Sequence, residues 1–130
     1  MDGLEGFKGT VPLFPLPGVI LFPRTILPLH IFEPRYREMV ADALSGNRLI
    51  SIALLKPGWE PDYYQAPAVY PVIGVGRVLQ DDKLEDGRYN ILLQGICRAR
   101  IEGSVEGRPY RQARIIVIPE PEVPVDPAIE

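Results

Sequence analysis

Residues 72–101 combine an alternating hydrophobic pattern with a polar turn. The segment reads VIGVGRVLQDDKLEDGRYNILLQGICRARI, in which two strand-like runs flank an acidic, glycine-containing turn. In the second run, one set of alternate positions holds Ile91, Leu93, Gly95, Cys97, Ala99 and Ile101, and the other set holds Gln94, Arg98, Arg100 and Glu102. Successive side chains of a strand point to opposite faces. The pattern therefore predicts a strand with one apolar, buried face and a solvent-exposed end.

The same kind of pattern predicts several more short strands. Fifteen prolines and twelve glycines favour short strands joined by many turns. Pro28 lies inside one predicted strand and has no backbone N–H to donate, which indicates an edge or a bulge. Leu49 begins an almost continuously apolar run, which is typical of a buried strand. The predicted strands are residues 11–14, 25–32, 49–55, 72–80, 88–101 and 111–118.

One helix is predicted near residues 34–45. Pro34 suits the first helical position, where no donor is needed. An apolar stripe at helical spacing follows. Gly46 is expected to end the helix in the left-handed conformation. The stripe consists of Tyr36, Met39, Val40, Ala43 and Leu44.

These elements predict a mainly β fold. Six strands without intervening helices indicate an antiparallel or mixed closed sheet, and not a doubly wound α/β fold. A chain of 130 residues, 46% of them hydrophobic, suffices for one domain with a core. Residues 119–130 hold four prolines, four acids and no basic residue, so they are expected to form an extended linker.

The sequence offers little for catalysis or metal binding. His30 is the only histidine and shares its strand face with apolar residues, so a structural role is expected. Cys97 lies on the inward face of its strand and is expected to be buried. Gly74 and Gly76 are not followed by a helix or a lysine, so a role in barrel curvature or in close backbone approach is favoured over phosphate binding. The acids of residues 81–86 do not match a calcium loop. We therefore expect no cofactor, no metal and no enzymatic activity.

Charge and composition narrow the partners and the compartment. A net charge of −3 gives no reason to expect nucleic acid, and the arginines between residues 98 and 114 are expected to pair with the acids of residues 81–86. Residues 1–9 form an arm without the features of a signal peptide. The apolar runs stop well short of the ~20 residues of a membrane helix. A single cysteine fits a reducing compartment, so a cytoplasmic protein is expected.

Residues 56–71 form the candidate binding segment. This long irregular stretch, KPGWEPDYYQAPAVYP, is stiffened by prolines and carries four aromatic residues: Trp59, Tyr63, Tyr64 and Tyr70. Long irregular loops in compact domains are often functional, and aromatics with a polar tip suit contact with exposed apolar segments. The alternative is that these side chains fold back to plug the barrel or cover the helix. The sequence leaves both interpretations open.

Residues 11–40 (VPLFPLPGVILFPRTILPLHIFEPRYREMV) and residues 72–101 together resemble the N-terminal domain of Lon ATP-dependent proteases. The IFEPRYR stretch is most similar to stand-alone proteins that carry this domain. The resemblance implies a six-stranded, PUA-like closed or pseudo-barrel over residues 10–118. Residues 119–130 would then be a linker or the start of a helical region. The resemblance also implies structural roles for Glu33, Pro34, Arg35, Tyr36, Gly95, Arg98 and Arg100.

The resemblance also implies a function. It indicates a non-catalytic domain that recognises unfolded or tagged polypeptides and acts beside a protease or ATPase. The ATPase and Ser–Lys protease domains of that family have no counterpart in these 130 residues. Two alternatives remain, an RNA-binding module of the PUA-like kind and a structural or oligomerising fragment.

Overall fold

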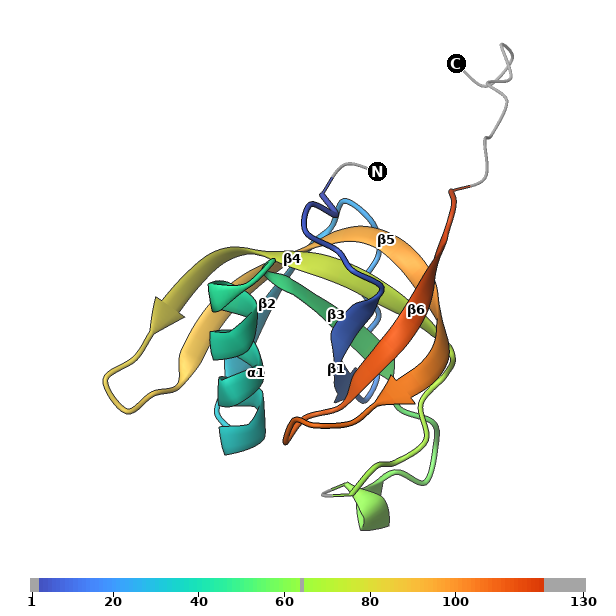
Figure 1. Ribbon diagram of the computed structural model, residues 1–130. Coiled ribbons are helices and arrows are strands. Elements are labelled where there is room, and N and C mark those ends of the chain that lie inside the picture. The colour runs from blue at the N-terminus through green and yellow to red at the C-terminus, as the bar shows by residue number, and fades with distance from the viewer. Residues whose placement is uncertain (1–2, 64, 121–130) are drawn as a thin grey trace, which may run out of the picture.

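The computed structural model describes residues 3–63 and 65–120 and consists mainly of β-strands (Figure 1). The predicted mainly β fold is confirmed, and so is the helix near residues 34–45. Tyr64 and most of the predicted linker lie outside the described residues. The elements are β1 Thr10–Leu16, β2 Ile26–Ile31, α1 Pro34–Ser45, β3 Leu49–Leu54, the 3-10 turn η1 Glu60–Asp62, β4 Val72–Lys83, β5 Tyr89–Val105 and β6 Gln112–Ile118.

The strands close into a ring that is not a regular barrel. The strand order is β2-β5-β4-β3-β1-β6, and β6 also pairs with β5, which closes the ring. The β1–β3 pair is parallel, while the other pairs are antiparallel. Among the described residues β2 pairs with β5 alone, so it is an edge strand, as Pro28 predicted. The long β4–β5 hairpin projects to one side of α1 (Figure 1).

Two apolar clusters fill the fold, and β5 contributes to both. Leu93 lies in the first cluster and Cys97 in the second, and both are buried, while Arg98 and Arg100 on the opposite face are exposed. The predicted alternation of β5 is therefore confirmed. Burial raises the pKa of the Cys97 thiol. The helix turns most of its predicted stripe into the first cluster, where Tyr36, Met39, Val40 and Ala43 are buried.

The predicted left-handed Gly46 is wrong. Gly46 has φ −118°, and the left-handed residue is Arg48, with φ 66°. The N–H groups of both residues donate to the Ala43 carbonyl, so the chain leaves the helix before it reverses at Arg48. The Arg48 side chain donates to Val78 O at 3.0 Å and to Asp81 at 3.0 Å. These contacts hold a conformation that a non-glycine residue seldom adopts.

Glycines on β4 and β5 admit a crossing loop, residues 17–25. A Cβ atom at Gly74 would stand 2.3 Å from Leu21 O, and one at Gly95 would stand 2.0 Å from Phe22 O. Gly76 is similarly crowded by Leu93 and Leu21. The expected close backbone approach is therefore confirmed at Gly74. The loop places Leu21 in the core, where it is 2% exposed.

The residues before β1 lie against the ring. Arg77 donates to Gly3 O at 2.7 Å and to the Glu5 carboxylate at 3.0 Å, and Leu4 and Phe7 pack on the second cluster. Among residues 3–63 and 65–120, no helix has the length and apolar character needed to cross a membrane.

Candidate functional site

The start of α1 anchors the aromatic loop, residues 56–71. The Tyr63 hydroxyl donates to Glu33 Oε1. Arg35 donates through Nε to Glu33 Oε2 at 3.2 Å and through Nη2 to Tyr63 O at 3.2 Å. Burial, followed by the hydrogen bond to Glu33, raises the pKa of Tyr63 to about 12. The phenol therefore keeps its proton, and this hydrogen bond, above the pH at which an ordinary tyrosine ionises.

Ring contacts extend this anchor to Trp59. The Arg35 guanidinium lies 4.7 Å from the centre of the Tyr36 ring and 5.6 Å from that of Tyr63. Trp59 meets Tyr63 edge to face at 5.6 Å. Both Trp59 and Tyr63 are half-buried. Tyr63 thus packs against residues that the resemblance marked as structural, and Trp59 packs on Tyr63. Contact of either residue with a client stays a prediction.

We expect Tyr63→Phe to release the aromatic loop without unfolding the domain. The change removes a hydrogen bond to a carboxylate, which contributes about 1.5–3 kcal/mol when buried and less at this half-exposed position. Trp59 fluorescence should become more accessible to iodide, while the melting temperature falls only slightly. The contact should also weaken in the native protein as pH rises through about 12, where Tyr63 ionises. Tyr70→Phe is the matched control, and an equal rise in quenching there would contradict the anchor.

Tyr70 lies apart from this anchor, beside an exposed apolar cleft. The cleft has a volume of about 220 Å³ and lies between the crossing loop and strands β3 and β4. Ile20 is 56% exposed, Phe22 is 55% exposed and Tyr70 is 42% exposed. Lys56 lies over the Tyr70 ring at 5.6 Å. We call this surface the apolar cleft, and its lining includes Val19, Ile20, Phe22, Leu54, Tyr70, Val72 and Arg98.

Sequence reasoning missed Ile20 and Phe22. The available signal was an apolar run between Pro17-Gly18 and Pro23 that did not continue either neighbouring strand. Such a run has no sheet partner to cover it. Its exposure depends on where the crossing loop lies over Gly74 and Gly95, which local periodicity does not encode.

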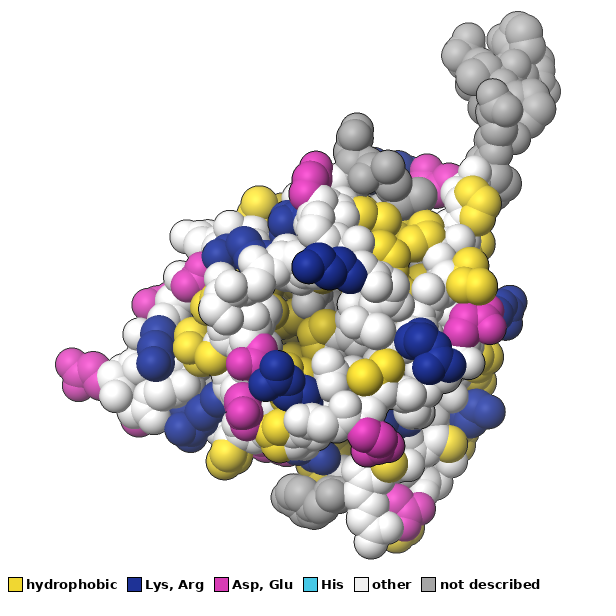
Figure 2. All heavy atoms as spheres, viewed as in Figure 1, with side chains coloured by type: hydrophobic (Ala, Val, Ile, Leu, Met, Phe, Trp, Pro, Cys, Tyr) yellow, Lys and Arg dark blue, Asp and Glu magenta, His cyan; other side chains and the backbone are white. Residues whose placement is uncertain are grey.

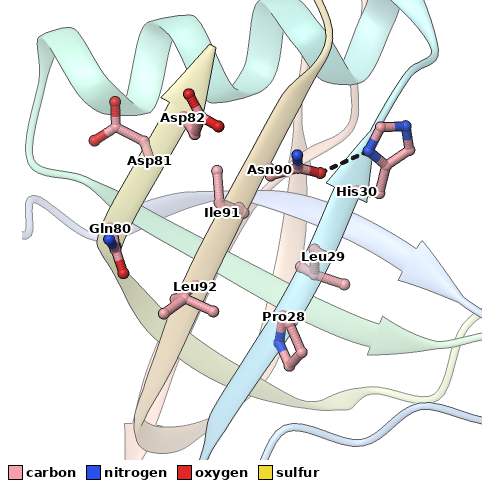
Figure 3. Close-up of a pocket in the computed structure, with 9 residues that line it drawn as sticks. All are labelled: Pro28, Leu29, His30, Gln80, Asp81, Asp82, Asn90, Ile91 and Leu92. Carbon is pink, nitrogen blue, oxygen red and sulfur yellow. Dashed lines mark hydrogen bonds between the residues drawn. The ribbon is translucent and has the colours of Figure 1, made fainter. Parts of the chain in front are cut away.

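A second hollow lies on the strands at the edge of the sheet (Figure 3). It has a volume of about 470 Å³ and is formed by β2, β4 and β5. His30 Nδ1 is 2.7 Å from Asn90 Oδ1, and its Nε2 is 3.3 Å from Arg88 Nη1. His30 is exposed, and its structural role stays a prediction. Pro28 and Leu92 give this groove a small apolar floor beside polar side chains (Figure 3).

The predicted pairing between the late arginines and the acids of residues 81–86 is wrong. Asp81 pairs with Arg48 at 3.0 Å and Asp86 with Arg88 at 2.7 Å. Among the described residues Arg98 forms no ion pair, and neither does Arg100. The face in Figure 2 carries basic and acidic side chains interspersed, without a continuous basic band.

The ring of strands and the single helix define a class of protein, a small mainly β domain. The family model described as "ATP-dependent protease La (LON) substrate-binding domain" matches residues 10–130. The chain belongs to this family. The expected relationship to the Lon N-terminal domain is thereby confirmed.

Curated relatives agree with this assignment. The chain is 35% identical over 111 residues to a Lon protease of Trichlorobacter lovleyi, covering 85% of this chain and 14% of that protein. It is 32% identical over 113 residues to a Lon protease of Desulfosudis oleivorans, covering 87% of this chain and 14% of that protein. The chain thus spans a small part of these relatives.

Two solved structures share the fold. A Lon N-terminal domain protein from Xanthomonas campestris superposes with a TM-score of 0.69 at 24% identity, covering 92% of this chain and 66% of that chain. The N-terminal domain of Mycobacterium avium complex Lon protease gives a TM-score of 0.67 at 17% identity, covering 88% of this chain and 57% of that chain.

Proposed function

We propose that this domain binds unfolded polypeptide segments through the apolar cleft and presents them for ATP-dependent proteolysis. One observation carries the proposal: Ile20, Phe22 and Tyr70 surround a cleft while each is more than 40% exposed. Exposed apolar patches of this kind mark interaction sites in soluble domains. Unfolded chains expose the apolar side chains that such a surface binds. The family's description as a substrate-binding domain supports the same assignment.

The cleft suits weak and unselective capture. Its small volume admits an individual side chain of an extended segment and not a folded surface. Burial of apolar area contributes about 25 cal/mol per Å² and requires no particular sequence. Tyr70 adds a hydroxyl and Arg98 a charged donor at the same surface, so backbone carbonyls of a client can be bound as well.

The domain itself is non-catalytic in this proposal. It works in the cytoplasm, and the ATPase and protease activities are supplied by other domains or by a partner. Residues 10–118 form the binding domain and residues 119–130 a linker. Trp59 and Tyr63 add a second contact for clients, including tagged ones, beside the anchored start of α1. Tyr64 is assigned to the same contact from the sequence alone.

The test is an Ile20→Ser/Phe22→Ser double variant. Binding to fluorescently labelled, unfolded casein should weaken at least about tenfold, because truncation of central apolar residues at an interface costs about 1–2 kcal/mol each. The melting temperature should stay near that of the wild type, since both side chains are exposed in the free domain. Fluorescence anisotropy measures the binding and circular dichroism the stability.

Leu79→Ser is the matched control, because Leu79 is 51% exposed and does not line the apolar cleft. Unchanged casein binding in the double variant, or an equal loss in Leu79→Ser, would overturn the assignment. A separate measurement of RNA binding tests the RNA-binding alternative. Single-stranded RNA should bind weakly at ~0.15 M salt because the chain lacks a basic excess.

A further inference from the structure

A polar pocket lies between the aromatic loop and the turn that joins β5 to β6. Its volume is about 300 Å³. The aromatic loop contributes Gln65 and Ala66, and residues 104–112 form the opposite wall. Three arginines line it, Arg35, Arg108 and Arg111, and among the described lining residues one is acidic, Glu106. We call this site the arginine pocket.

Arg111 is the least compensated of these cations. Its Nη1 donates to the Pro67 carbonyl at 2.7 Å, and the residue is half-buried. Among the described residues no carboxylate lies within ion-pair distance of it. Burial lowers the pKa of Arg111; Tyr36 acts in the opposite direction, and the nearby charge of Arg35 lowers this pKa further. A half-buried cation beside a like charge is costly unless an anion compensates it.

The other two arginines are paired, one closely and one loosely. Arg35 contacts Glu33 at 3.2 Å. Arg108 Nη1 is 3.8 Å from Asp42 Oδ2, and that same oxygen accepts the Tyr110 hydroxyl at 2.6 Å. Asp42 is therefore already hydrogen-bonded by Tyr110. Arg108 retains donors that can turn toward the pocket, because its side chain is 53% exposed.

We propose that the arginine pocket binds an oxyanion, a carboxylate or phosphate group, held by Arg111 and Arg108 and favoured by the charge of Arg35. Guanidinium groups bind both kinds of oxyanion through paired N–H donors. The group comes either from a polypeptide, as an acidic side chain or a terminal carboxylate, or from free phosphate. The site uses no residue of the apolar cleft, so it stands independently of the proposed function.

The test is a titration with inorganic phosphate at constant ionic strength, followed by the arginine Nε–Hε resonances in NMR spectra. We expect saturable shifts at Arg111 and Arg108. The dissociation constant should rise about tenfold in Arg111→Gln, which loses a charge-assisted contact. It should rise several-fold in Arg108→Gln. Arg100→Gln removes an exposed charge of β5 outside the pocket and should leave the affinity unchanged.

A second titration separates the two sources of the anion. The probe is a short acetylated peptide that ends in glutamate, compared with the same peptide amidated at its C-terminus and carrying glutamine. Saturation by the acidic peptide identifies a polypeptide carboxylate, and saturation by phosphate alone identifies the free ion. Arg108→Gln keeps the test valid if Arg111→Gln disturbs the loop through Pro67. Shifts that do not saturate with either probe, or that persist unchanged in Arg108→Gln, would overturn the proposal.

Discussion

Leu93→Ala should lower the free energy of unfolding by about 2–5 kcal/mol, as truncation of a buried leucine does. Leu93 is 0% exposed and belongs to the cluster that receives α1. It also stands against Gly76, where a Cβ atom would be 2.7 Å from Leu93 Cγ. The cavity would therefore open where β4, β5 and the crossing loop meet. Urea denaturation followed by circular dichroism measures the loss, which could leave a domain of this size unfolded.

Gln94→Ala is the control on the same strand. Gln94 is half-buried on the opposite face, so its loss should cost under about 1 kcal/mol. Comparable losses in the free energy of unfolding at Leu93 and Gln94 would contradict the assignment of Leu93 to the core-facing side of β5.

The alternation that identifies Leu93 is local, which is why the sequence predicted it. A period of two over β5 and a period near 3.6 over α1 depend on residues close in the chain. The edge position of β2 was predictable for a similar reason. Pro28 has no backbone N–H to donate to a neighbouring strand, and this holds whatever residues surround it. Much of the fold was accessible in this way.

The candidate site was accessible only in part, because its contacts join distant segments. Tyr63 was recognised as a candidate, but its partner Glu33 lies thirty residues earlier and at the start of a helix. Tyr70 was recognised without Ile20 and Phe22, which reach it only because the crossing loop passes over the sheet. The positive φ of Arg48 likewise depends on its contacts with Val78 and Asp81. None of these contacts between distant segments produces a periodic pattern in the sequence.

Gly95 is the residue on which the crossing loop depends. Its N–H donates to Thr25 O at 2.8 Å, and its carbonyl accepts the Arg24 N–H at 2.8 Å. A Cβ atom there would stand 2.0 Å from Phe22 O, which is backbone and not a movable side-chain end. The loop cannot retreat from an added methyl group without stretching these hydrogen bonds or withdrawing Leu21 from the core.

Gly95→Ala should therefore destabilise the domain by about 1–3 kcal/mol or more, the range of overpacking in a closely packed site. Gly103→Ala is a matched control on the same strand, because the added Cβ meets the end of the Arg114 side chain at 2.4 Å, and that end can swing away. A lower entropy of the unfolded chain offsets part of the cost in both variants. Thermal unfolding should show a large fall for Gly95→Ala and little change for Gly103→Ala. Casein binding should fall in Gly95→Ala alone, because displacement of the crossing loop moves Ile20 and Phe22. Equal melting temperatures for the two variants would contradict the dependence of the loop on Gly95.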